Sequence, residues 1–280
     1  DARRGPWRLL DQLLQVIEPG RTIASAAAAP FLERRFELVP MGAVGAEPGP
    51  SYRLTGQERR GFGPWGATTR FVGRRDELEA LWGRQASALG GHGQIVAVVG
   101  EPGVGKSRLF HEFTHSPRLD GWLVLESASV SYGQTMSYLP VVNLLKFYFQ
   151  IGDRDTPQDI REKVTAKILA LDRALEPSLP ALFALLDVPV DDPRWQSLNP
   201  SQRRQQMLDA VKRLLLREAQ VQPLLVVIED LHWIDPESQA LLDVLVESLP
   251  SARLFLLVTY RPRYEHRWAS RAPYAQVHLG

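Results

Sequence analysis

The chain has 280 residues, of which 33 are basic and 32 are acidic, so its formal net charge is only +1. This balance gives no argument for binding nucleic acid or an anionic membrane through overall charge. The sequence has no cysteine, which excludes disulfides and thiolate metal sites, and no apolar run of the roughly 18 residues that a membrane-spanning helix needs. We expect a cytoplasmic globular protein without a membrane segment, and a fragment of a longer chain because it begins at Asp1.

Residues 1–56 are predicted to form a small α+β piece. A helix is expected at residues 7–17, followed by short strands separated by proline and glycine clusters, at residues 21–24, 31–39 and 51–54. About 50 residues with few apolar side chains form only a marginal independent core. Glycines and a proline without periodicity predict a linker at residues 57–69, and a larger domain at residues 70–280.

The segment from Leu13 to Gly56, which contains an E-P-G turn, resembles the end of bacterial class III adenylate/guanylate cyclase catalytic domains. In that family the helix before the turn carries an asparagine and, four residues later, an arginine that stabilise the transition state. Arg8 and Gln12 occupy those positions here, and the family's metal-binding aspartates would lie upstream. We therefore expect no cyclase activity from this chain.

The stretch from Gln94 to Ser107 reads as a buried strand, a glycine-rich turn and a Lys-Ser pair. It fits the phosphate-loop pattern G-x-x-x-x-G-K-[ST] at every fixed position. The glycines let backbone N–H groups converge on phosphate oxygens, Lys106 can neutralise phosphate charge, and the Ser107 hydroxyl can ligate Mg²⁺. A plain glycine-rich turn with a surface lysine is the disfavoured alternative. The predicted nucleotide-binding residues of this stretch are Gly100, Glu101, Pro102, Gly103, Val104, Gly105, Lys106, Ser107 and Arg108.

The sequence Phe71-Val72-Gly73-Arg74 precedes a predicted helix that runs to about Leu89. It resembles the segment that borders the adenine pocket in AAA+ and STAND ATPases, which implies that Val72 and Arg74 contact the nucleotide. The alternative is an ordinary helix start with a solvated Arg74.

After the loop, a helix at residues 106–115 should direct its positive end at the phosphates, and residues 122–125 form a second strand. Helices are then expected at residues 139–150, 157–171 and 180–186, and a long one starts after the capping residue Asn199. We interpret this insert between the second and third strands as packing structure.

Residues 223–230 form an apolar strand that ends in two acids, a pattern typical of a Walker B strand. Glu229 would reach the metal and Asp230 would orient the hydrolytic water, and Asp230 could share the metal contact because Glu229 stands where many relatives have aspartate. Two acids that simply cap an apolar strand are the alternative. Ser107, Glu229 and Asp230 are thus the predicted metal ligands, and the six histidines show no zinc-like spacing.

Residues 231–238 resemble the E-D-L-H-W-A-D motif of STAND ATPases, although Asp235 is also a helix N-cap candidate. His232 and Trp233 could lie near the nucleotide or form a buried aromatic pair. A fourth strand at residues 253–260 precedes Arg261, the candidate γ-phosphate sensor, with Thr259 as a weaker candidate. Arg261 could instead belong to a solvated, arginine-rich tail. A fifth strand is expected at residues 275–279.

The resemblance to STAND and AAA+ ATPases covers residues 70–280. It implies an α/β P-loop NTPase fold, a three-layer sandwich whose parallel five-stranded sheet has the order 5-1-4-3-2, without the lid and winged helix of relatives. It also implies ATP or ADP as ligand, Mg²⁺ as cofactor, and slow hydrolysis by Lys106, Glu229, Asp230 and Arg261. The expected role is a nucleotide-dependent switch in a cyclase-linked or transcription-regulator-type signalling protein, acting on a protein partner or further domains. A non-hydrolysing scaffold and a DNA-associated origin-recognition-type ATPase are the alternatives, although this chain shows no DNA-contacting domain.

Overall fold

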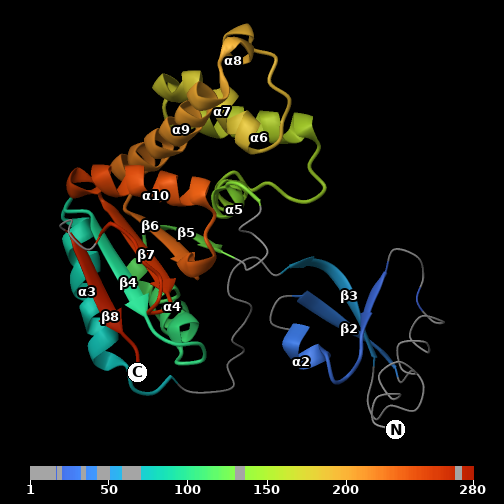
Figure 1. Cartoon of the computed structure of the whole chain (residues 1–280), viewed down its shortest axis with the longest axis vertical. Coiled ribbons are helices and arrows are strands. Elements are labelled where there is room, and N and C mark those ends of the chain that lie inside the picture. The colour runs from blue at the N-terminus through green and yellow to red at the C-terminus, as the bar shows by residue number, and fades with distance from the viewer. Residues whose placement is uncertain are drawn as a thin grey trace. The chain divides into compact units, whose positions relative to one another are not determined.

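The chain divides into two compact units, Asp1–Arg70 and Phe71–Gly280 (Figure 1). The computed structural model describes residues 17, 21–32, 36–42, 51–58, 71–129, 136–268 and 273–280. The helix expected at residues 7–17 and most of the expected linker lie outside these residues. No helix in the described ranges combines the length and apolar character that crossing a membrane requires.

The described part of the first unit is a three-stranded antiparallel sheet with the order β1-β3-β2. Its strands are β1 (Thr22–Ala24), β2 (Phe36–Gly42) and β3 (Ser51–Glu58), and the short helix α2 (Ala29–Leu32) follows β1. The strand expected at residues 31–39 is therefore wrong in its first part, because an alanine-rich run with a proline in the first turn suits a helix. β3 continues through Glu58, which pairs with Phe36, so residues 57 and 58 belong to the sheet rather than to a linker.

The second unit contains a five-stranded sheet with the order β5-β6-β7-β4-β8 and parallel neighbours throughout. This confirms the predicted order 5-1-4-3-2, read from the opposite edge. The second strand is longer than the predicted residues 122–125, because its polar end still pairs with the third strand, Ala128 opposite Glu229. The strands are β4 (Gln94–Val99), β5 (Leu123–Ala128), β6 (Leu224–Glu229), β7 (Leu254–Tyr260) and β8 (Tyr274–His278).

Eight α-helices are described in this unit, and they cover both faces of the sheet. Alternate residues of each strand point to opposite faces, so Val96 and Val98 join a core with α3 and α4, while Ile95 and Ala97 join the core with the other helices. Three layers result, as predicted. The helices are α3 (Arg75–Leu89), α4 (Lys106–Thr114), α5 (Leu139–Tyr148), α6 (Pro157–Leu171), α7 (Leu179–Leu185), α8 (Pro193–Ser197), α9 (Pro200–Val221) and α10 (Pro236–Ser248).

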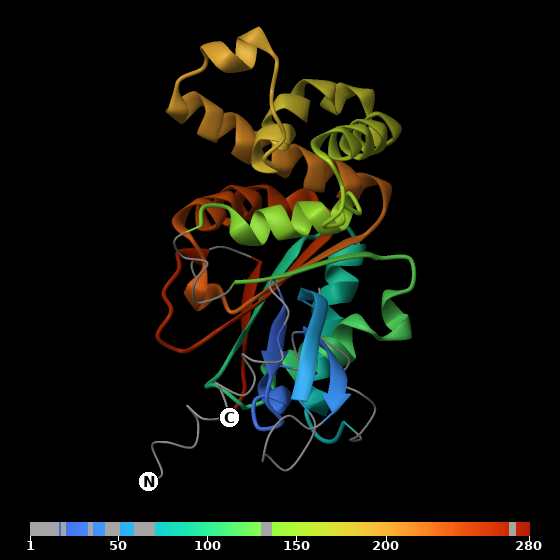
Figure 2. The same cartoon turned by 90° about the vertical axis from the view of Figure 1, so that its right-hand side faces the viewer.

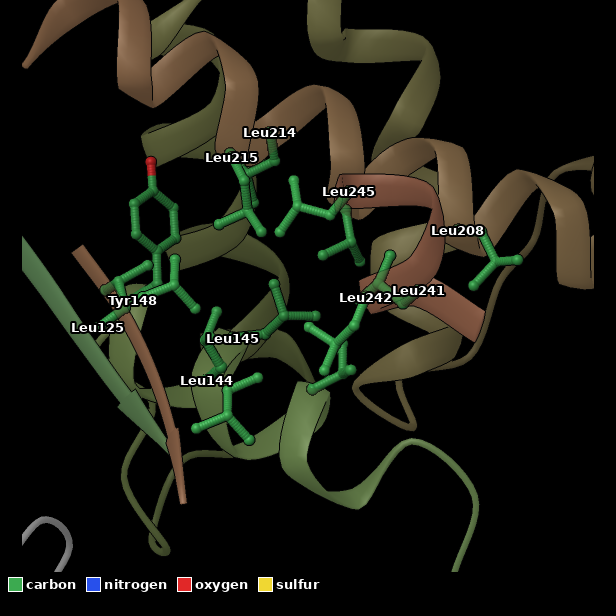
Figure 3. Close-up of a cluster of buried hydrophobic side chains, with 14 of the residues drawn as sticks. Leu125, Leu144, Leu145, Tyr148, Leu208, Leu214, Leu215, Leu241, Leu242 and Leu245 are labelled. Atoms are coloured by element: carbon green, nitrogen blue, oxygen red, sulfur yellow. The ribbon is translucent and has the colours of Figure 1, made fainter. Parts of the chain in front are cut away.

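The helical insert between β5 and β6 shares its core with the sheet. In Figures 1 and 2, α6, α7 and α8 lie farther from the sheet than α5 and α10. Figure 3 shows how leucines of α5, α9 and α10 meet beside Leu125 of β5. Each fully buried leucine contributes roughly 1.5–3 kcal/mol. The insert is therefore an integral layer of the second unit.

Local sequence signals position the helices as expected. Thr156 and Asn199 each form a capping box with the residue three positions later, at the starts of α6 and α9. Asp235 caps α10 by accepting hydrogen bonds from the backbone N–H groups of Glu237 and Ser238, which confirms the predicted N-cap. The short α8 was not predicted.

Candidate functional site

The candidate phosphate loop joins β4 to α4. Gly103 and Gly105 have φ angles of 85° and 96°, a region that side chains with a Cβ rarely adopt. Gly100 is required for a different reason, since a Cβ there would lie 2.8 Å from Val104 Cγ2 and 2.9 Å from the carbonyl oxygen of Leu279. Glycine thus allows the positive φ angles at positions 103 and 105 and the close packing against Leu279 at position 100.

Lys106 is the first residue of α4, where the helix dipole is positive, and only 9% of it is exposed. Its Nζ donates hydrogen bonds to the carbonyl oxygens of Gly100, at 2.7 Å, and Glu101, at 2.9 Å. Burial lowers the pKa of Lys106, and the nearby positive charge of Arg261 lowers it further, while Asp230 acts in the opposite direction. The lysine thus folds back on the loop, and an anion in the loop would offer it a stronger partner.

Ser107 and Glu229 lie 122 residues apart in sequence, yet the Ser107 hydroxyl donates a 2.6 Å hydrogen bond to Glu229 Oε2. Glu229 ends β6 and is 5% exposed. Burial raises its pKa to about 8, the charge of Asp230 adds to the rise, and the bond from Ser107 opposes it. Two of the three predicted metal ligands therefore meet.

Asp230 directly follows β6 and adopts the left-handed conformation, with φ 55° and ψ 45°. Its backbone N–H donates a 2.8 Å hydrogen bond to Thr259 Oγ1, and Thr259 is fully buried on β7. The Asp230 side chain is 49% exposed, with Oδ1 3.8 Å from His232 Nδ1. Thr259 thus fixes the turn that presents the Asp230 carboxylate, a contact that sequence reasoning missed because it joins two strands.

Arg261 is the first residue after β7. Its Cζ lies 5.8 Å from the ring centroid of Trp233, which belongs to a single 3₁₀ turn, Leu231–Trp233. Burial lowers the pKa values of both Lys106 and His232, and the positive charge of Arg261 lowers them further. Tyr260, the residue before Arg261, pairs with Val99, the last residue of β4 before the loop. The structure therefore places this candidate sensor on the same side of the sheet as the phosphate loop.

The predicted adenine-side residues lie at the start of α3. Val72 is 80% exposed, whereas Arg74 donates hydrogen bonds to Glu77 Oε1, at 2.9 Å, and to the carbonyl oxygen of Gly280, at 2.7 Å. Arg74 is thus partly exposed and hydrogen-bonded at both positions to the chain itself. Arg108 pairs with Glu112 on α4. Nucleotide contacts by Val72, Arg74 and Arg108 stay predictions.

Residues 70–258 match the family model described as the AAA ATPase domain. The chain belongs to this family. An uncharacterised protein of Rhizobium meliloti (strain 1021) is 26% identical over 202 residues, which are 72% of this chain and 19% of that protein. The chain therefore spans about a fifth of the length of this curated relative.

Solved structures with a similar fold include Cdc6p from Pyrobaculum aerophilum, with 15% identity, a TM-score of 0.38, and coverage of 71% of this chain and 41% of that one. Another is a STAND protein with a tetratricopeptide repeat sensor from Pyrococcus horikoshii, with 14% identity, a TM-score of 0.32, and coverage of 75% and 23%. Similarity at this level leaves the function to be argued from the residues of this chain.

Domains of the AAA ATPase family typically bind ATP together with Mg²⁺. The residues present fit both ligands. Among the described residues, nothing lies within 4 Å of a Cβ built on Gly103 or Gly105, so the loop has room on that side. Ser107 and Glu229 supply oxygen atoms, the donors that Mg²⁺ prefers, and one or two protein oxygens with phosphate and water complete its shell. No group of three or more His, Asp or Glu side chains that could hold a metal ion is found in the described ranges, so the phosphate and water must supply the remaining ligands.

One further contact in the AAA ATPase domain was not predicted from the sequence. Asp235 is 1% exposed, and its Oδ1 accepts a 2.9 Å hydrogen bond from the backbone N–H of Tyr138 in addition to those from its own helix. Tyr138 has a φ of 64° and precedes α5. One carboxylate thus anchors the starts of α5 and α10, which no local pattern could reveal.

The buried carboxyl group of Glu229 predicts a pH dependence of stability in the magnesium-free protein. The pKa of Glu229 is about 8 in the folded protein and has its ordinary value of 4.5 in the unfolded chain. Between these two pH values, Glu229 is therefore protonated in the folded state and ionised in the unfolded state. The free energy of unfolding should therefore fall as pH rises from about 5 to about 8, by at most about 1.4 kcal/mol per pH unit. Glu229→Gln removes this titration.

The measurement is urea unfolding of wild type and Glu229→Gln in EDTA at several pH values. The unfolding free energy of wild type minus that of Glu229→Gln should decrease steadily from about pH 5 to about pH 8. It should stay constant above pH 8, because the Glu229 carboxyl is then ionised in both the folded and the unfolded state. A difference that does not depend on pH would contradict the prediction.

Proposed function

We propose that residues 71–280 bind ATP·Mg²⁺ and use the state of the nucleotide as a switch. The observation that supports this most directly is the hydrogen bond between Ser107 and Glu229 at 2.6 Å, since it joins the hydroxyl after the phosphate-loop lysine to the acid at the end of β6. A phosphate loop alone would indicate only an anion site. The added acid makes it a site for a nucleotide with its metal ion.

Each residue has a distinct task in this proposal. Lys106 exchanges the carbonyl oxygens of Gly100 and Glu101 for phosphate oxygens, and Ser107 and Glu229 hold the metal ion, which when bound polarises the phosphate oxygens. Asp230 orients the attacking water from the end of β6. Arg261 places positive charge beside the terminal phosphate.

Binding is tested by titration calorimetry of the 280-residue chain with ATP, with and without Mg²⁺. We expect saturable binding with Mg²⁺ and weaker binding in EDTA, because Ser107 and Glu229 then have no ion to hold. Equal affinity in both conditions would contradict the metal assignment, and no binding in either would contradict the function.

We propose that hydrolysis is slow. The Asp230 carboxylate is half exposed and lies 3.8 Å from His232, so an attacking water would be only loosely held. Asp230→Asn should lower the single-turnover rate by about 100-fold, a typical effect of losing a general base, and leave ATP affinity within about threefold. Asp209 of α9 is an acid of similar exposure far from the loop in sequence, so Asp209→Asn is the matched control and should change neither.

The single-turnover experiment also tests a second candidate function, a scaffold that binds ATP without cleaving it. Radiolabelled ATP bound to excess wild-type protein should yield ADP over minutes to hours at the slow rates that switch ATPases and GTPases reach without activators. If the bound ATP stays intact while the wild-type protein remains folded, the chain is a scaffold that binds ATP without cleaving it.

We further propose that this module serves a cyclase-linked or transcription-regulator-type signalling protein of the cytoplasm. The support is the resemblance of residues 13–56 to the end of cyclase domains and the greater length of the curated relative, of which this chain covers 19%. The coding sequence upstream of Asp1 tests this idea. A cyclase core there would support it, and an unrelated domain would refute the cyclase link.

A further inference from the structure

The guanidinium of Arg261 rests over the ring of Trp233. The 5.8 Å between Arg261 Cζ and the ring centroid lies within the range of a cation–π interaction, which the electron-rich ring face provides. Both side chains are half-buried. Among the ion pairs formed by the described residues, none includes Arg261. The ring is thus a partner that an anion could replace.

The two residues follow neighbouring parallel strands, β6 and β7, at the edge where the candidate site lies. The hydrogen bond from the Asp230 N–H to Thr259 Oγ1, 2.8 Å long, ties these strand ends together. The backbone N–H of Gly100 donates a 3.3 Å hydrogen bond to the carbonyl oxygen of Tyr260, the residue before Arg261, so Arg261 begins beside the phosphate loop. A short movement of its long side chain would bring it to a phosphate.

The backbone on both sides is fixed by local hydrogen bonds. The Trp233 N–H donates to the Asp230 carbonyl at 2.8 Å, and the Tyr264 N–H donates to the Arg261 carbonyl at 2.9 Å. His232 packs beside Trp233, with ring centroids 5.1 Å apart. The indole is therefore held in place, whereas the arginine side chain beyond Cα has several rotatable bonds.

We propose that Trp233 is a positioning residue that holds Arg261 in the nucleotide-free domain, and that the γ-phosphate of ATP competes with the ring for the guanidinium. This inference rests on the proposed function. ATP draws Arg261 off the ring and ADP does not, because only ATP has the terminal phosphate. The segment that follows the Walker B acids thereby distinguishes the two nucleotides.

The competition predicts an unusual sign for a mutation. Trp233→Leu removes the ring and keeps an apolar side chain, so ATP·Mg²⁺ should bind about two- to fivefold more tightly and ADP·Mg²⁺ should bind unchanged. In an Arg261→Ala background, the same substitution should change neither affinity. Trp233→Phe keeps an aromatic ring that binds the guanidinium more weakly, so its ATP·Mg²⁺ affinity should increase less than that of Trp233→Leu. A purely structural role of Trp233 would instead weaken the binding of both nucleotides.

Tryptophan emission gives an independent readout. The emission of Trp233, taken as the difference between wild type and Trp233→Phe, should change with ATP·Mg²⁺ and stay constant with ADP·Mg²⁺. In Arg261→Ala, neither nucleotide should change it. Calorimetry on the same samples shows whether each nucleotide is bound.

The outcomes separate the inference from the function on which it rests. If calorimetry shows ATP·Mg²⁺ binding while Trp233 emission is unchanged, or if Trp233→Leu weakens ATP binding, this inference is overturned and the proposed function stands. If wild type binds no ATP, both are overturned. Tighter ATP binding by Trp233→Leu that depends on Arg261 supports the inference.

Discussion

Replacement of Lys106 by alanine is expected to lower the affinity for ATP·Mg²⁺ by about 100-fold or more, roughly 3 kcal/mol of binding free energy. The loss is large because Lys106 is a buried cation at the start of α4. The groups that it contacts in the loop are neutral carbonyls, which cannot attract a phosphate in its place. Arg108, the other cation of this stretch, forms an ion pair with Glu112. Charge-assisted contacts with phosphate are among the strongest hydrogen bonds in proteins.

The same substitution should leave the fold intact. In the nucleotide-free domain, Lys106 pays a desolvation cost, seen in its lowered pKa. Its two acceptors are the backbone carbonyls of Gly100, which is buried, and Glu101, which is exposed, and relief of the desolvation cost offsets the loss of these two bonds. We expect the free energy of unfolding to change by less than about 1 kcal/mol. Lys212→Ala, on α9, is the control and should bind ATP like wild type. Calorimetry and urea unfolding measure both quantities, and a Lys106→Ala protein with affinity within fivefold of wild type would refute the assignment.

The largest effect on stability is expected from Gly93→Ala, just before β4. A Cβ at Gly93 would lie 2.2 Å from the carbonyl oxygen of Leu249, 3.0 Å from the Leu249 carbonyl carbon and 3.1 Å from the Ala252 carbonyl oxygen. These are backbone atoms of the turn that leads into β7, so no side-chain rotation relieves the clash. The strand that carries the phosphate loop, or that turn, must move. We expect a loss of about 3 kcal/mol or more in the free energy of unfolding.

Gly83→Ala is the matched control. Gly83 lies in α3, is exposed, and has nothing within 4 Å of a built Cβ among the described residues. Alanine is the better helix former, so this variant should gain about 0.5–1 kcal/mol. Urea unfolding followed by tryptophan fluorescence measures both variants. Equal stability of Gly93→Ala and wild type would show that the close approach to Leu249 does not constrain the fold.

Gly93 also illustrates what sequence reasoning could reach. The phosphate loop was recognised because Gly100 to Ser107 follow a local pattern, and the need for Gly103 and Gly105 is visible in their own backbone angles. Gly93 matches no motif. Its importance depends on a turn more than 150 residues away in sequence, which packs against it only in the folded chain.

Local sequence patterns predicted the strand, loop and helix around Lys106, the apolar strand that ends at Glu229, and the helix caps at Asn199 and Asp235. Each feature depends on hydrogen bonding or side-chain periodicity within a few residues, so the neighbouring residues suffice to predict it. The predicted boundaries were wrong where pairing with a distant strand decides them. Glu126 and Ser127 of β5 and Glu58 of β3 are polar, so the sequence did not reveal that they belong to sheets.

Which of these features lie in contact depends on the order of the strands in the sheet. The sheet order, which the sequence supported through family resemblance alone, brings β4 and β6 onto either side of β7. That order places Ser107 against Glu229, Asp230 against Thr259 and Arg261 over Trp233. Parallel strands end at a common edge, so their order in the sheet determines which strand ends are neighbours. Local sequence carries no record of that order.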